Sequence, residues 1–148
     1  MSSDEAVTKD LIETLEDGKE GFAKGAEKLD DSESPELAKT FRRFSEQRSS
    51  FSAELRQIAA EYGDDIHESG SMAGALHRGW MSLKDALTGS DPKGVLQAAE
   101  QGEDHAVKEY DKALGEDISP TLRSVVVRQA AEVKAAHDQV RTLAESHS

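Results

Sequence analysis

The sequence predicts an all-α protein folded as one four-helix bundle, and three observations predict this class. Hydrophobic residues make up 36% of the chain and aromatic residues only 5%, and β-branched residues are scarce outside the run 125–127, a mix that favours helix over strand. Each proline follows a helix-capping residue, and apolar residues recur at alternating intervals of three and four. At 148 residues, the chain is expected to form a single domain, residues 1–148, with its own core.

The prolines mark where three of the helices begin. Ser and Asp cap helix N-termini, and proline is favoured at the first helical position. The three pairs are Ser34-Pro35, Asp91-Pro92 and Ser119-Pro120. A further helix is expected to begin near Asp4, whose carboxylate can cap the opening turn. The predicted helices cover residues 4–29, 35–62, 71–88, 92–114 and 120–145.

Each of the four long helices carries one narrow apolar stripe. In the first helix the stripe consists of Leu11, Leu15, Gly18, Phe22, Gly25 and Leu29. In the second helix it consists of Leu37, Phe41, Phe44, Arg48, Phe51, Leu55, Ile58 and Tyr62. The third and fourth helices repeat this spacing, and four such stripes together are typical of a bundle.

The lengths of the connections predict the order of the helices. Residues 30–34 and 115–119 form short connections, so the helices that they join must be antiparallel neighbours. The middle connection, residues 63–91, includes the helix predicted over 71–88, on which we expect Trp80 to be buried. About 17 helical residues rise ~25 Å, nearly the length of the bundle. We therefore favour a long helical crossover between helices two and three, the ferritin-like arrangement; an up-down-up-down bundle with the short helix across one end is the alternative.

Polar residues interrupt the stripes at one level, the midpoint of the bundle. The predicted polar layer consists of Arg48, Glu103, Lys19, Gln129 and Glu132. Arg48 continues an apolar stripe, so its side chain must point inward, and a buried guanidinium needs a carboxylate partner, for which Glu103 is the candidate. Gly18 and Gly102 leave room for it, and Gln129 or Glu132 is expected to accept its remaining hydrogen bonds. The alternative is that Arg48 lays its stem on the core and reaches water.

The midpoint of the bundle is also the level at which a bundle of this kind can hold a di-metal centre. Such a centre takes a Glu from each of two helices and Glu-x-x-His from each of the other two. Here the residue three before His137 is Lys134, and Glu132 points in a different direction from His137. Glu103 is the one well-placed ligand, and Arg48 puts a permanent cation where the metal charge would lie. We therefore assign no metal, cofactor or catalytic residues, and expect neither a di-iron nor a di-manganese centre.

Charge and composition exclude further classes of function. The net charge of −12 argues against nucleic acid, which needs a basic patch. The absence of cysteine leaves no disulfide and no thiolate ligand or nucleophile. No apolar stretch approaches the ~20 residues of a membrane span. The N-terminus has neither the basic nor the apolar region of a secretory leader, so we expect a cytoplasmic protein without a membrane partner.

Four runs carry a resemblance to a known family. They are LIETLEDGKEGF, GALHRGWMSLKDALTG, EQGEDHAVKEYDKAL and EVKAAHDQVRTL, and GALHRGWMSLKDALTG is the most specific, because a generic bundle would not need it. With these runs the chain, from about residue 7 to residue 143, resembles a bacterial family of four-helix-bundle proteins classed as a ferritin-like domain of unknown function. The resemblance implies the ferritin-like fold, a bacterial source and no established activity. Wider relatives include di-iron oxidases, ferritins and stress-linked proteins, but their ligand motif is replaced here by Arg48-x-x-Phe51 and Lys134-x-x-His137.

Two classes of function follow from these observations. The first is a non-enzymatic helical bundle that acts through its surface, as a homo-oligomer or by binding a protein partner, with a possible link to stress. The alternative is a diverged di-metal oxidase or metal-storage protein that uses iron or manganese.

Overall fold

The structure, a computed structural model, describes residues 2–30, 35–61 and 92–146. These residues form four helices and no strand: α1 (Ser2–Asp30), α2 (Pro35–Glu61), α5 (Pro92–Leu114) and α6 (Pro120–Ser146). The predicted all-α four-helix bundle is confirmed. The predicted short helix over residues 71–88, with Trp80, lies outside the described residues.

The helix ends follow from local chemistry. α2, α5 and α6 begin at the three prolines, as predicted. At α6 the Ser119 hydroxyl accepts a hydrogen bond from the backbone N–H of Leu122, at 3.3 Å, which satisfies one of the free donors of the first turn. At α1 the helix begins at Ser2, close to the predicted start, but the predicted cap was wrong, because Asp4 lies inside the first turn. The Asp4 carboxylate instead accepts a hydrogen bond from the backbone N–H of Ser119, at 2.9 Å, and ties the start of α1 to the start of α6.

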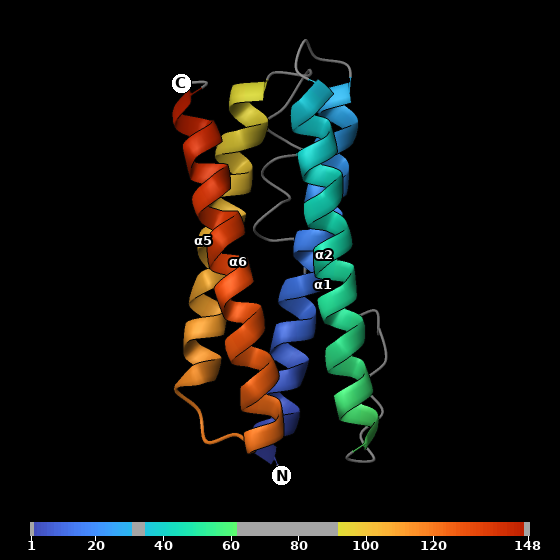
Figure 1. The fold of residues 1–148 in the computed structure, drawn as a ribbon, viewed down its shortest axis with the longest axis vertical. Helices are drawn as coiled ribbons and strands as arrows, with labels where there is room; N and C mark the ends of the chain where they lie inside the picture. The colour runs from blue at the N-terminus through green and yellow to red at the C-terminus, as the bar shows by residue number, and fades with distance from the viewer. Residues whose placement is uncertain (1, 31–34, 62–91, 147–148) are drawn as a thin grey trace.

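The helices form a ring in which every neighbouring pair is antiparallel. α1 packs against α2 and α5, and α6 packs against α5 and, over a shorter stretch, against α2. In Figure 1, α1 and α6 run upward while α2 and α5 run downward. α2 and α5 are therefore parallel and lie on opposite sides of the bundle axis.

This arrangement decides between the two predicted topologies. α2 ends at the bottom of Figure 1 and α5 begins at the top, so the chain between them must join opposite ends of the bundle. An up-down-up-down bundle would require α5 to begin where α2 ends. The crossover topology is therefore the one that the described helices adopt.

Two apolar clusters fill the interior, one in each half of the bundle. The lower cluster contains Leu11, Leu15, Leu55, Tyr110, Leu122 and Val126 among others, and the upper cluster contains Phe22, Leu29, Phe41, Leu96, Ala99 and Val140 among others. Arg48 and Glu103 belong to neither cluster, and their positions in α2 and α5 fall between them. Among the described helices, none is both long and apolar enough to cross a membrane.

Candidate functional site

Arg48 and Glu103 form an ion pair in the middle of the bundle. Both residues are only 1% exposed. Nη1 of Arg48 donates to Oε2 of Glu103 at 2.7 Å, and Nη2 donates to Oε1 at 2.5 Å. The pair is thus bidentate, and it spans the axis between two helices that are not neighbours in the ring.

The surroundings of Arg48 explain how a buried guanidinium is accommodated. A Cβ added to Gly18 of α1 would lie 3.3 Å from Nη1 of Arg48, so the glycine leaves the space that the guanidinium uses. The guanidinium carbon lies 5.3 Å from the centre of the Phe22 ring, close enough for a cation–π contact. The third nitrogen, Nε, donates to Oε1 of Gln47 at 3.1 Å. All three guanidinium nitrogens therefore donate to an acceptor.

A second chain of hydrogen bonds runs from the core to the surface. The Tyr110 hydroxyl donates to Oε1 of Gln129 at 2.7 Å, and Nε2 of Gln129 donates to Oε1 of Glu54 at 2.8 Å. Glu54 in turn pairs with Arg128 at the surface. Burial raises the pKa of the Tyr110 hydroxyl above its usual range, so the hydroxyl stays protonated and can donate.

The structure brings together some of the predicted polar layer and not the rest. Arg48, Glu103 and Gln129 are buried, but Gln129 binds Tyr110 and Glu54 rather than Arg48. The prediction that Gln129 or Glu132 accepts the remaining hydrogen bonds of Arg48 was wrong, because Gln129 is engaged elsewhere and Nε of Arg48 donates to Gln47.

Lys19 and Glu132 do not join the layer. The Lys19 side chain is 41% exposed and lies 3.6 Å from Glu16, and Glu132 is exposed. Each is adjacent in sequence to a stripe residue, Gly18 or Val133, and adjacent helical residues point ~100° apart. At that angle a long charged side chain can reach water, as both of these do, so their assignment to the layer was wrong.

Sequence reasoning missed three members of this network: Gln47, Tyr110 and Glu54. Tyr110 continues the apolar spacing of the third predicted helix, and this spacing does not reveal a role for its hydroxyl. Its buried hydroxyl needs a partner, and the buried Gln129 on the neighbouring helix was the signal that could have found this hydrogen bond.

The residues at the midpoint do not fit a di-metal centre. Both carboxylate oxygens of Glu103 are occupied by the guanidinium of Arg48, which is a permanent cation. A metal ion there would have to displace that cation and recruit further carboxylates. Across residues 2–30, 35–61 and 92–146, no three His, Asp or Glu side chains gather where a metal ion could be held.

His137 lies at the junction of α5 and α6 rather than in the interior layer. Its Nε2 is 2.5 Å from Oδ1 of Asp104 on α5, and its Nδ1 is 3.2 Å from Oδ1 of Asp138. Burial lowers the pKa of His137, but the hydrogen bonds to the two carboxylates outweigh burial and leave the pKa raised above its ordinary value of 6.5. The contact therefore links two helices most strongly when the imidazole is charged.

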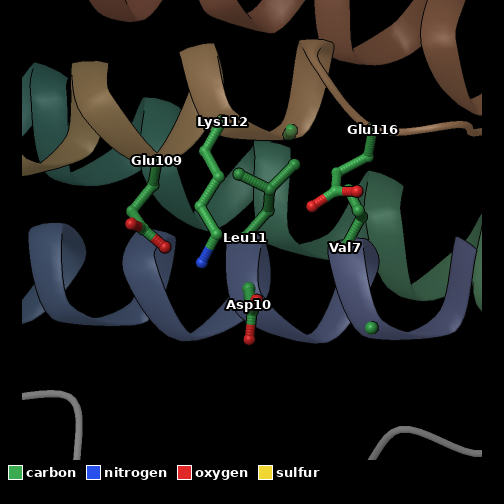
Figure 2. Close-up of a pocket in the computed structure, with 8 residues that line it drawn as sticks. Val7, Asp10, Leu11, Glu109, Lys112 and Glu116 are labelled. Carbon is green, nitrogen blue, oxygen red and sulfur yellow. The ribbon is translucent and has the colours of Figure 1, made fainter. Parts of the chain in front are cut away.

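The surface carries a groove between the first half of α1 and the end of α5 (Figure 2). Its volume is about 260 Å³. The largely buried side chains of Val7, Leu11 and Ala113 form an apolar floor. Four charged residues form the rim: Asp10, Glu109, Lys112 and Glu116. We call this feature the α1–α5 groove.

Comparison with protein families gives one match. Residues 5–116 match the model of a family described as Domain of unknown function (DUF2383). The chain belongs to this family. The DUF2383 match spans most of α1 and all of α2 and α5, and so includes Arg48, Glu103 and the α1–α5 groove. Gln129 and the rest of α6 lie beyond it. Comparison with curated proteins found no match.

Proposed function

We propose that this DUF2383 chain is a non-enzymatic helical-bundle protein that acts through its surface, by binding a protein partner. The observation that carries the proposal is the ion pair between Arg48 and Glu103. It fills the level of the bundle where a di-metal centre would have to lie, and its charges already satisfy each other. We therefore place the function of the described bundle on its exterior.

The exterior supports this role by its charge. The net charge is −12, which favours encounters with basic partners. The α1–α5 groove adds an apolar floor to an acidic rim, and interfaces commonly combine an apolar centre with a polar edge. Self-association into a homo-oligomer is the other form that a surface function could take.

The proposal also includes a ferritin-like relationship, a cytoplasmic location, a bacterial source and a link to stress. The topology, with parallel α2 and α5 and one long connection, is that of ferritin-like bundles, which supports a ferritin-like relationship. The absence of cysteine suits a reducing compartment, which supports a cytoplasmic location. A bacterial source and a link to stress rest on the resemblance of the four sequence runs described above.

Metal analysis tests this proposal against the alternative of a diverged di-metal oxidase or storage protein. The protein is purified without an affinity tag, because tags bind metal, and its iron and manganese are measured per chain. We expect substoichiometric amounts of both, since Arg48 already holds the Glu103 carboxylate. One or more tightly held iron or manganese ions per chain, lost in the Glu103→Gln variant, would contradict the proposal.

A further inference from the structure

The α1–α5 groove differs from a second groove of similar size on the described surface. Between α2 and α6 lies a groove of about 260 Å³ whose rim includes Arg43 and Glu132, one charge of each sign. The rim of the α1–α5 groove has three carboxylates, Asp10, Glu109 and Glu116, against one ammonium, Lys112. Of these two grooves, the α1–α5 groove is therefore the one with a net charge that selects the sign of its occupant.

The charged groups of this rim are available to a ligand. Asp10, Lys112 and Glu116 are exposed, and Glu109 is half-buried. Within the described residues, the side chains of all four make no ion pair or hydrogen bond, and the hydrogen bonds that Thr14 and Arg123 donate go to the backbone oxygens of Asp10 and Glu116. Figure 2 shows Glu109 and Lys112 reaching from α5 toward α1, and Glu116 close to Val7.

The pKa of a neighbouring carboxyl group indicates that negative charge is concentrated at the α1–α5 groove. The pKa of Glu13 on α1 is raised, first by burial and then by the charge of Asp10, with Glu109 adding to the effect and Lys9 opposing it. A group whose neighbours disfavour its negative charge lies in a negative potential. A cation entering the groove would relieve that potential, whereas a second copy of this acidic chain would add to it.

From this groove we infer a docking site for a basic amphipathic helix of a protein partner. The apolar face of such a helix covers Val7, Leu11 and Ala113, and its Lys or Arg side chains pair with the three rim carboxylates. Because α1 and α5 already supply two antiparallel ridges, a third helix can lie along the depression between them. This inference rests on the proposed surface function and names the class of partner.

The test uses a synthetic, fluorescently labelled helix of leucine and lysine as the probe, with binding followed by fluorescence anisotropy. The groove variant Asp10→Asn/Glu109→Gln/Glu116→Gln removes the rim charge. The matched control Glu27→Gln/Glu36→Gln/Glu46→Gln removes the same charge from exposed residues outside the groove. We expect the dissociation constant to rise about tenfold for the groove variant and less than about twofold for the control.

Two further comparisons test the apolar part of the site. Ala6 is an exposed residue that lines the groove, and Ala53 is an exposed residue of α2 outside it. Ala6→Trp should block the probe and weaken binding, whereas Ala53→Trp should leave binding unchanged. A peptide in which alanine replaces leucine, with every lysine kept, should bind at least about tenfold more weakly than the probe.

Several results would overturn the inference. They are a probe that does not bind, equal weakening by the groove and control variants, equal binding of the alanine–lysine peptide, and self-association that the groove variant abolishes. The last would assign the groove to a second copy of the chain. None of these results depends on the metal content, so failure of this inference and failure of the proposed function are distinguishable.

Discussion

At the scale of single residues, the contact between His137 and Asp104 makes the stability of the bundle depend on pH. The folded-state pKa of His137 is raised above 6.5, so the folded protein binds this proton more tightly than the unfolded chain does. The stabilisation is therefore complete below about pH 6.5 and is lost as the pH rises through the higher folded-state pKa.

The variant His137→Gln keeps a side chain that can hydrogen-bond to Asp104 but removes the titration. We expect the wild-type protein to be more stable than the variant at about pH 5, and the difference to shrink toward about pH 9. Urea unfolding of both proteins across this range measures it. Asp17, whose pKa burial raises to about 7, titrates equally in both proteins and cancels in the difference. A stability difference that does not change with pH would show that the contact carries no charge effect.

The angle of a residue from its helix stripe decides how well its burial could be predicted from the sequence. Arg48 lies on the stripe itself, and its inward direction could be predicted from spacing alone. Lys19 and Glu132 lie one residue away from a stripe position, where a long charged side chain can reach water. Glu103 lies equally close to Gly102 but is buried, because it pairs with Arg48. The hydrogen bond between Tyr110 and Gln129 depends on the axial offset of α5 against α6, which packing fixes and sequence spacing does not.

At the scale of elements, α1 and α2 pack so closely that Gly25 has no room for a side chain. A Cβ at this position would lie 2.8 Å from Cδ2 and 2.9 Å from Cε2 of the Phe41 ring, and 3.3 Å from Cγ1 of Val95. The Phe41 ring is itself held edge-on against Phe22, with ring centres 5.1 Å apart. The ring therefore cannot move away without losing that contact.

Gly25→Ala should consequently destabilise the protein, although alanine is the better helix former. The helical preference favours alanine by about 1 kcal/mol, while overpacking costs about 1–3 kcal/mol. We expect a net loss of up to about 2 kcal/mol in the free energy of unfolding, measured by urea titration. Phe41→Leu should make the same substitution less costly, because the smaller side chain leaves space. Stabilisation by Gly25→Ala in the wild-type background would contradict this close packing.

The start of a helix could be predicted from the sequence where a residue type strongly prefers a single position in a helix. Prolines after capping residues located the starts of α2, α5 and α6. Asp4 was less informative, because an acidic residue is favoured both at the cap and inside the first turn. Its partner, the backbone N–H of Ser119, is 115 residues away in the chain and becomes a neighbour only in the folded bundle.

At the scale of the whole molecule, the ion pair between Arg48 and Glu103 separates two apolar clusters and joins two helices across the axis. Such a pair adds little net stability over a well-packed apolar pair, but breaking it strands a buried charge. We propose that it fixes the register of α2 against α5, because only one axial offset lets Nη1 and Nη2 of Arg48 meet both carboxylate oxygens of Glu103.

The central claim is that the middle of this bundle is a closed structural ion pair, and urea unfolding of one single and one double variant tests it most directly. Arg48→Ala alone should destabilise the protein by roughly 3–5 kcal/mol, because it leaves the Glu103 carboxylate buried and unpaired. Arg48→Met combined with Glu103→Gln should recover much of that loss, since neither residue is then charged. If Arg48→Ala left the unfolding midpoint unchanged, or if the double variant were no more stable than the single one, the claim would be wrong.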